Sequence, residues 1–166
     1  FDNDLTDAIL LKSLKQNGPI GKSWSLHVIA GRGKPDLSLD VVPMLEDEER
    51  SVRLSAVRTL YRLGQSDAIG PVRMFMRDPD KYMRGAAAYA LGALRDKDSI
   101  PALCLALMDD KGWVRRNAAW SLLEFGESLN LVASMKNDED VGVRMFAENA
   151  FARLNSERNI SEVEKS

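Results

Sequence analysis

Asp78-Pro-Asp-Lys-Tyr-Met-Arg84 is the stretch of sequence that decides the fold, because near-copies of it recur along the chain. The other copies are Asp47-Glu-Glu-Arg-Ser-Val-Arg53, Asp109-Asp-Lys-Gly-Trp-Val-Arg115 and Asp138-Glu-Asp-Val-Gly-Val-Arg144. The steps between their first residues, from 47 to 78 to 109 to 138, are 31, 31 and 29 positions. A period of this length, with helical patterning inside it, predicts a stacked repeat array, and most such arrays bind partners without catalysis.

The composition is that of a soluble folded domain. The chain has 166 residues, 45% of them hydrophobic and 29% charged. Its net charge of −2 lacks the basic excess that a general nucleic-acid binder carries, and no apolar run reaches the ~18 residues of a membrane span. One cysteine, Cys104, excludes an internal disulfide and fits a reducing compartment, so we expect a cytoplasmic protein. The first residue is Phe1 rather than Met, which indicates a processed form or a piece of a longer protein.

Each copy of the phrase begins a predicted amphipathic helix. Val52, Ala56, Leu60 and Leu63 follow one another at i, i+4, i+8 and i+11, which is one stripe of an α-helix. The small alanine in mid-stripe indicates the close approach of a neighbouring helix. Glycines are predicted to end two of these helices, and Asp-Pro is predicted to begin one as N-cap and N1. These end signals are Gly64, Gly126 and Asp78-Pro79.

A shorter helix fills the rest of each unit. Residues 67–76 and 98–107 are the clear examples, and Ser128–Met135 is a version two residues shorter. Towards the N-terminus, Leu5–Leu14 and Leu37–Leu45 are predicted as short helices and Gly21–Gly33 as a long one. We therefore expect a single domain over 1–154, followed by a polar and frayed tail over 155–166. Its units are 1–15 (partial), 16–46, 47–77, 78–108, 109–137 and 138–154 (partial).

The repeat resembles the HEAT-like repeat of bacterial and archaeal proteins, and most of all the type named after phycobilisome lyases. Met83-Arg-Gly-Ala-Ala-Ala-Tyr-Ala-Leu-Gly92 and Val114-Arg-Arg-Asn-Ala-Ala-Trp-Ser-Leu122 carry the resemblance, which covers about Gly21 to Leu154. It implies an all-α fold, a curved α-solenoid of about four to five HEAT-like helix pairs with an armadillo-like superhelical shape. The repeat occurs in scaffolds, lyase subunits and enzymes, so it does not fix the function.

The resemblance also implies a ladder of hydrogen bonds between adjacent units. In the family, the aspartate caps the long helix and the arginine bridges to the neighbour, for which a planar guanidinium is suited. We interpret these residues as structural. They are Asp47, Arg53, Asp78, Arg84, Asp109, Arg115, Asp138 and Arg144.

The sequence offers no catalytic constellation. Deoxyhypusine hydroxylase, a family enzyme, builds its iron site from His-Glu pairs just after the repeat arginine, and here those positions hold none, for example Gly85-Ala86. With His27 as the sole histidine, a multi-histidine metal site is excluded. Cys104 has no adjacent base, and Glu46–Glu49 is interpreted as a solvated turn. We expect no metal, no cofactor and no catalytic residue.

Aromatic residues on the long helices give the best functional signal. Tyr82 and Tyr89 lie seven residues apart, hence on one helix face, and Trp113 and Trp120 repeat them one unit later. We expect them to face the concave groove, where aromatic and arginine side chains are typical anchors at interfaces. An alternative is that the rings pack between units. The candidate partner-binding residues are Tyr82, Tyr89, Trp113, Arg116, Asn117, Trp120, Arg58 and Arg62.

These observations favour a non-catalytic scaffold that binds a protein or peptide in its concave groove. A subunit of bilin-lyase type, which would chaperone a linear tetrapyrrole onto an acceptor cysteine, is the first alternative. A HEAT-like nucleic-acid binder is the second, and Arg50, Arg53, Arg58 and Arg62 form the one local basic cluster that would serve it.

Overall fold

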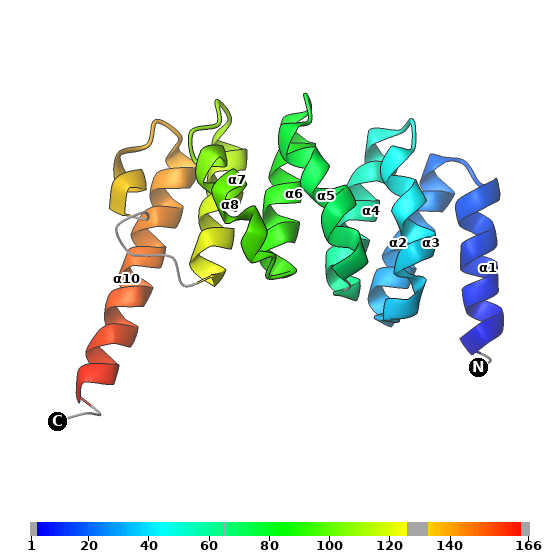
Figure 1. Ribbon diagram of the computed structural model, residues 1–166, viewed down its shortest axis with the longest axis horizontal. Helices are drawn as coiled ribbons and strands as arrows, with labels where there is room; N and C mark the ends of the chain where they lie inside the picture. Colours follow the sequence, from blue (N-terminus) through cyan, green and yellow to red (C-terminus); the bar gives the residue numbers. More distant parts are fainter. Residues whose placement is uncertain (1–2, 65, 126–132, 164–166) are drawn as a thin grey trace.

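The structure is an array of helices in two layers. It is a computed structural model that describes residues 3–64, 66–125 and 133–163, and within these residues every regular element is an α-helix or a 3-10 helix. The long helices follow one another along the array from one end to the other (Figure 1). They are α2 (Pro19–Arg32), α4 (Arg50–Leu63), α6 (Lys81–Ala93), α8 (Gly112–Glu124) and α10 (Val141–Val163).

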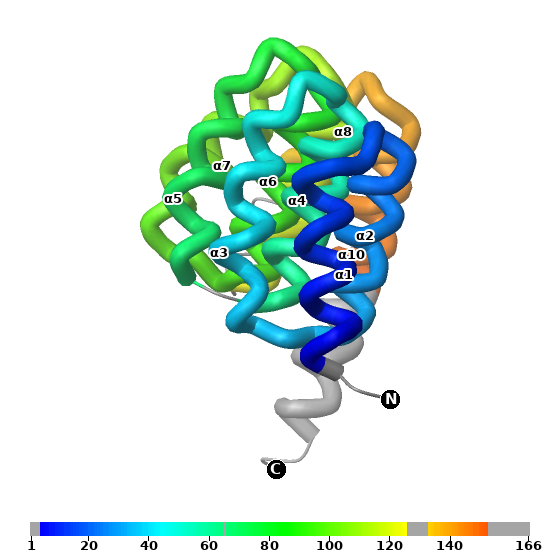
Figure 2. Tube along the Cα trace, turned by 90° about the vertical axis from the view of Figure 1, so that its right-hand side faces the viewer, coloured from blue at the N-terminus to red at the C-terminus, as the bar shows by residue number. Residues whose placement is uncertain are grey.

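The second layer consists of shorter helices that lie on one side of the long ones. Figure 2 shows α3 (Ser38–Val41), α5 (Ile69–Met74) and α7 (Ile100–Ala106) together on that side, while α2, α4 and α8 lie on the other. An additional helix, α1 (Asn3–Gln16), packs against α2 at the N-terminal end. Consecutive long helices pack against each other, which confirms the predicted α-solenoid. The short segments are continued by 3-10 turns at Pro35–Leu37, Val42–Glu46, Ser66–Ala68, Phe75–Arg77, Lys97–Ser99 and Met135–Asn137.

The predicted stripe of each long helix forms the core. Val52, Ala56 and Leu60 are fully buried, and Leu63 nearly so. The small alanine in mid-stripe lets the next helix approach closely. Because the neighbouring helix fills the space around it, a larger side chain at this position would overpack the core. All four aligned alanines have no exposed surface, namely Ala56, Ala87, Ala118 and Ala147.

The end of α4 and the start of α6 can be compared with the end signals predicted from the sequence. Gly64 ends α4 as predicted: its φ of 73° lies in the left-handed region, and its N–H donates to the carbonyl of Leu60 at 3.1 Å. Asp78 differs from its prediction as an N-cap, as do Asp47 and Asp109, because Glu49 and Lys111 hold the N-cap positions of α4 and α8. Helix α6 begins at Lys81, and Asp80 is its cap. Asp78 instead accepts the N–H of Asp80 at 2.7 Å, so it fixes the turn before the helix, and Pro79 does not stand at N1. The other glycine, at position 126, lies outside the described residues.

The two ends of the chain differ from the sequence-based expectation. The first helix spans 14 residues and is not short. At the C-terminal end, α10 continues to Val163. The tail beyond Leu154, which the sequence predicts to be frayed, is therefore helical up to that residue. The apolar periodicity ends at Leu154, but the sequence after Gly142 contains no glycine or proline that would end the helix. Most of the short helix predicted over Ser128–Met135 lies outside the described residues.

Candidate functional site

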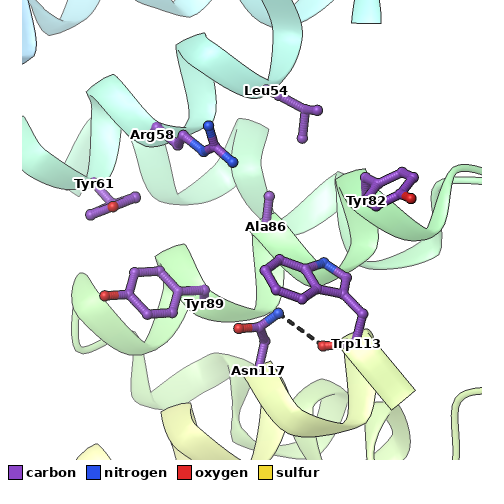
Figure 3. Close-up of a pocket in the computed structure, with 8 residues that line it drawn as sticks. All are labelled: Leu54, Arg58, Tyr61, Tyr82, Ala86, Tyr89, Trp113 and Asn117. Carbon is purple, nitrogen blue, oxygen red and sulfur yellow. Dashed lines mark hydrogen bonds between the residues drawn. The ribbon is translucent and has the colours of Figure 1, made fainter. Parts of the chain in front are cut away.

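Five of the predicted partner-binding residues line one pocket, which is formed by side chains of the long helices alone (Figure 3). The pocket has a volume of about 220 Å³. Helices α4, α6 and α8 each contribute side chains at spacings of three or four residues, which places them on one face of each helix. The predicted members are Arg58, Tyr82, Tyr89, Trp113 and Asn117, and the structure adds Leu54, Tyr61 and Ala86.

Trp113 reaches the pocket because Gly85 leaves space for it. A Cβ built on Gly85 would lie 2.1 Å from the indole Nε1, far inside contact distance. As whole residues, Trp113 is 38% exposed and Tyr82 is 44% exposed, so both remain open to a partner. Asn117 is buried and donates from Nδ2 to the backbone carbonyl of Trp113 at 2.8 Å, which fixes its amide at the pocket wall.

A row of three rings runs across the units beside the pocket. Tyr61 meets Tyr89 edge to face, with 5.2 Å between centroids, and Tyr89 stacks on Trp120 at 4.2 Å with an interplanar angle of 18°. Burial raises the pKa of the Tyr89 phenol, with smaller contributions from Tyr61 and Glu124, so the ring stays neutral. Trp120 therefore lies behind Tyr89 rather than in the pocket wall. It faces a separate pocket of about 210 Å³ between α8 and α10, with Phe146 opposite.

Arginines surround the rings. The guanidinium of Arg50 lies 5.0 Å from the centroid of Tyr82, and that of Arg116 lies 4.9 Å from the centroid of Trp113, both within the range of cation–π attraction. Arg50 also meets Asp80 at 3.6 Å. Arg116 thus contacts the site through Trp113 without lining the pocket, whereas Arg62, on the exposed side of α4, does neither.

Sequence reasoning missed Tyr61 and Arg50 as members of this site. Arg58 and Tyr89 share a column of the repeat, but the pocket is built from helices that are staggered, so α4 also contributes Leu54 and Tyr61, whose columns hold glycines in α6. Tyr61 follows Arg58 by three residues on α4, and this helical spacing was the signal that could have found it.

The ladder residues form paired hydrogen bonds between adjacent units at two consecutive junctions, α6–α8 and α8–α10. Arg84 donates from Nε and Nη2 to both carboxylate oxygens of Asp109, at 2.8 and 3.0 Å, and its Nη1 donates to the carbonyl of Asp78 at 2.9 Å. Arg115 repeats this arrangement with Asp138, at 2.8 and 2.6 Å. Hydrogen bonding from Arg115 holds the pKa of the Asp138 carboxyl below its usual range, against the opposing effect of burial.

The rest of the ladder is less regular. Lys22, which stands 31 residues before Arg53, takes the arginine position at the first junction and donates to Asp47 at 2.7 Å. Arg53 donates only to the carbonyls of Asp47 and Glu48, and within the described residues it forms no bond to Asp78. Arg144, at the last step, donates likewise to the carbonyls of Asp138 and Glu139.

The family follows from a direct match. The family model described as HEAT repeats matches residues 38–124 and 70–152, more than half of the chain. The chain belongs to the HEAT-repeat family. The comparisons also confirm its likeness to the phycobilisome-lyase type of HEAT-like repeat, through the relative and the lyase complex described next.

A curated relative is the uncharacterized phycocyanin operon protein Y of Pseudanabaena tenuis (strain PCC 7409). It is 30% identical over 123 residues, which cover 72% of this chain and 29% of the relative, so the HEAT chain spans less than a third of that protein. Among solved structures, YIBA of E. coli aligns with a TM-score of 0.72 over 99% of this chain and 65% of its own, at 17% identity. The complex of CpcE and CpcF of phycocyanin lyase from Nostoc sp. PCC7120 aligns with a TM-score of 0.54 over 83% and 73%, also at 17% identity. Likeness at this identity shows the HEAT fold alone.

The junction between α4 and α6 lacks two polar ties that its neighbours have, although Arg73 bridges the same two units by its ion pair with Asp96 at 2.6 Å. At the α2–α4 and α6–α8 junctions a buried hydroxyl reaches the preceding long helix: Ser121 donates to the carbonyl of Ala88 at 2.7 Å, and Thr59 shares its proton between the carbonyls of Leu26 at 3.0 Å and Ser55 at 2.8 Å. The equivalent residue of α6 is Ala90, which has no donor. This junction therefore lacks both the hydroxyl tie and the Arg53–Asp78 bond, and the aromatic pocket lies across it. A groove of about 1080 Å³ borders the same junction on the side of the short helices, around Leu45, Pro71, Met74 and Phe75.

The remaining sequence candidates stay apart from the pocket. His27 is exposed on α2, and Cys104 is exposed on α7 in the other layer. Over the part of the chain that the structure describes, no three His, Cys, Asp or Glu side chains are grouped so that they could hold a metal ion. None of the described helices is long and apolar enough to cross a membrane.

Proposed function

We propose that this HEAT array is a non-catalytic scaffold that binds a segment of a protein or peptide partner in its concave groove, along the face of α4, α6 and α8 that carries the aromatic pocket. The observation that carries the proposal is the pocket lined by Tyr82, Tyr89 and Trp113, with Arg58 at its edge. Tryptophan, tyrosine and arginine are enriched among the residues that contribute most to binding at protein interfaces. The extended surface of a repeat array is well suited to such a partner.

The size of the pocket favours a protein side chain over a whole small molecule. Pockets that enclose drug-sized ligands measure about 300–1,000 Å³, whereas this one has about 220 Å³. One large apolar side chain of the partner fills such a volume. The partner's residues on either side of it would then lie along the open face of the pocket. Two half-exposed rings, Tyr82 and Trp113, form the rim that the segment would cover.

The test is an affinity capture from a lysate of the source organism. The parent chain is compared with a variant that carries Tyr82→Ala, Trp113→Ala and Trp120→Ala. A matched control variant carries Met74→Ala, Leu105→Ala and Met108→Ala, which remove three exposed apolar side chains from the short-helix layer. We expect one protein that the parent and the control retain and the aromatic variant loses, all three chains being equally helical by circular dichroism. Equal capture by the two variants would contradict the proposal.

A bilin-lyase-type subunit is the second candidate, and the observation that favours it is the relative whose name places it in a phycocyanin operon. An arginine-bordered aromatic face suits a flat and acidic pigment, although a tetrapyrrole exceeds the pocket and would have to lie across α4, α6 and α8. Its test is the visible absorbance of a linear tetrapyrrole mixed with the chain. A shifted and enhanced band that Trp113→Ala abolishes, followed by pigment transfer to an acceptor cysteine, would replace the scaffold proposal.

A further inference from the structure

The charge around the aromatic pocket is positive, although the chain as a whole carries a net charge of −2. The eight lining residues include no acid. Two arginines, Arg50 and Arg116, lie over rings of the rim. A third, Arg58, projects from α4 towards the middle of the pocket in Figure 3. A partner that carries carboxylates therefore meets complementary charge on this face.

Arg58 differs from the arginines of the ladder because it has no partner of its own. Within residues 3–64, 66–125 and 133–163 it forms no hydrogen bond, ion pair or ring contact, and its side chain is exposed. Arg84 and Arg115, by contrast, each hold a carboxylate with two parallel hydrogen bonds. The planar guanidinium of Arg58 thus offers a fork that suits a carboxylate, beside an apolar cavity.

The ring faces argue against a nucleic acid at this site. Stacking of bases requires open aromatic faces. Here one face of Tyr89 is stacked on Trp120, and Arg116 covers a face of Trp113. Tyr82 has Arg50 and Lys81 near its ring, at 5.0 and 5.1 Å from the centroid. Several ring faces are thus already covered by another ring or by a cation. The remaining space is a compact cavity and does not offer open aromatic faces on which bases could stack.

We propose that the pocket binds an acidic segment of a partner protein, in which one aromatic or large aliphatic side chain enters the cavity between Tyr82, Tyr89 and Trp113 while a neighbouring carboxylate pairs with Arg58. This inference rests on the proposed function, because it names the chemistry of the partner for the same face. A flanking acid of the segment then meets Arg116 at the rim, whereas Arg50 already pairs with Asp80. The α4–α6 junction, which lacks the buried hydroxyl tie of its neighbours, is where the cavity would widen for the inserted side chain.

The test uses three terminally blocked heptapeptides and the full chain. The first peptide has a central Phe among Asp and Glu residues, the second replaces the acids by Lys, and the third replaces Phe by Ala. We expect calorimetric binding of the first peptide that is at least tenfold tighter than that of the other two. Arg58→Ala should weaken it tenfold or more and reduce its salt dependence. Arg77→Ala removes an exposed arginine of the short-helix layer and should leave it unchanged.

Each other outcome overturns the inference. The lysine peptide binding as tightly as the acidic one, no peptide binding at all, or an oligothymidylate binding more tightly than the acidic peptide would each exclude an acidic partner. Arg58→Ala and Arg77→Ala behaving alike would remove the role of Arg58. If the aromatic variant nevertheless loses its partner in the lysate capture, the scaffold stands and only the acidic chemistry of its ligand is wrong.

Discussion

The indole of Trp113 rests against the backbone of Gly85 on the neighbouring helix, where a Cβ would come within 2.1 Å of Nε1. We therefore expect Gly85→Ala to displace the ring and to close the pocket. Alanine favours a helix over glycine by about 1 kcal/mol, so a net loss of stability, of about 1–3 kcal/mol as in other overpacked sites, arises from the clash. The free energy of unfolding in urea and the near-ultraviolet circular dichroism of the tryptophans measure the two effects.

Two further variants separate the clash from an effect of alanine itself. Gly70→Ala lies on α5, where a Cβ meets nothing within 4 Å, and it should not destabilise the fold. Trp113→Ala removes the ring that the new Cβ meets, so Gly85→Ala should no longer cost stability in that background, a coupling that a double-mutant cycle measures. Additive effects of the two substitutions would show that the contact does not position Trp113.

The ladder predicts that the same substitution differs in effect between junctions. Arg115→Lys keeps the charge but loses the paired hydrogen bonds to Asp138, where the arginine side chain is 7% exposed. We expect a loss of about 1–3 kcal/mol in the free energy of unfolding, because hydrogen bonds between charged groups contribute that much. Arg53→Lys should cost less, since Arg53 bonds only to two carbonyls. Equal losses in urea unfolding would mean that the aspartate bonds do not distinguish the junctions.

Acid should weaken the array through the same aspartates. Arg115 holds the pKa of Asp138 below its ordinary 3.8, and Lys34 does the same for Asp7. A depressed pKa in the folded state gives stability that is complete above the unfolded value and is lost as the pH falls through the folded one. The urea midpoint should therefore decline below about pH 4. Asp138→Asn should flatten that decline, whereas Asp36→Asn, at an exposed carboxyl, should follow the parent. A decline that Asp138→Asn leaves unchanged would contradict this assignment.

The repeat made the fold predictable from the sequence, because stacking requires the same small and large residues in every unit. The fully buried alanine of each unit and the end of α4 at Gly64 followed from that regularity. Asp78 misled because Asp-Pro is a strong start signal, whereas in the structure the aspartate fixes the turn before the N-cap residue Asp80. The α10 extension was missed because loss of apolar periodicity indicates loss of packing, not loss of helix.

The candidate site was predictable only in part. The heptad spacing of Tyr82 and Tyr89 placed both on one face, and the structure brings them into one pocket. The stacking of Tyr89 on Trp120 is the alternative packing between units that their shared column offered, whereas the contribution of Tyr61 depends on the stagger between neighbouring helices. A single sequence does not contain that stagger, because it arises from how the buried stripes interlock.

The α4–α6 junction leads to the last prediction. Thr59, Ala90 and Ser121 stand 31 residues apart, and the two hydroxyls each reach the carbonyl 33 residues earlier. By the same offset, a hydroxyl introduced by Ala90→Ser would reach the carbonyl of Val57. We expect this substitution to raise the free energy of unfolding by about 0.5–1.5 kcal/mol and to slow hydrogen exchange in α4 and α6.

The matched control for that junction is Ser121→Ala, which removes an existing tie and should lower the free energy of unfolding by about 1 kcal/mol. Because the pocket spans α4 and α6, a tighter junction should also restrict its widening, and the acidic peptide should then bind less tightly to Ala90→Ser than to the parent. A stabilised variant with unchanged peptide affinity would show that the pocket is already open in the free chain. A destabilised one would show that the new hydroxyl finds no acceptor, since a buried donor left without a partner costs about 1–3 kcal/mol.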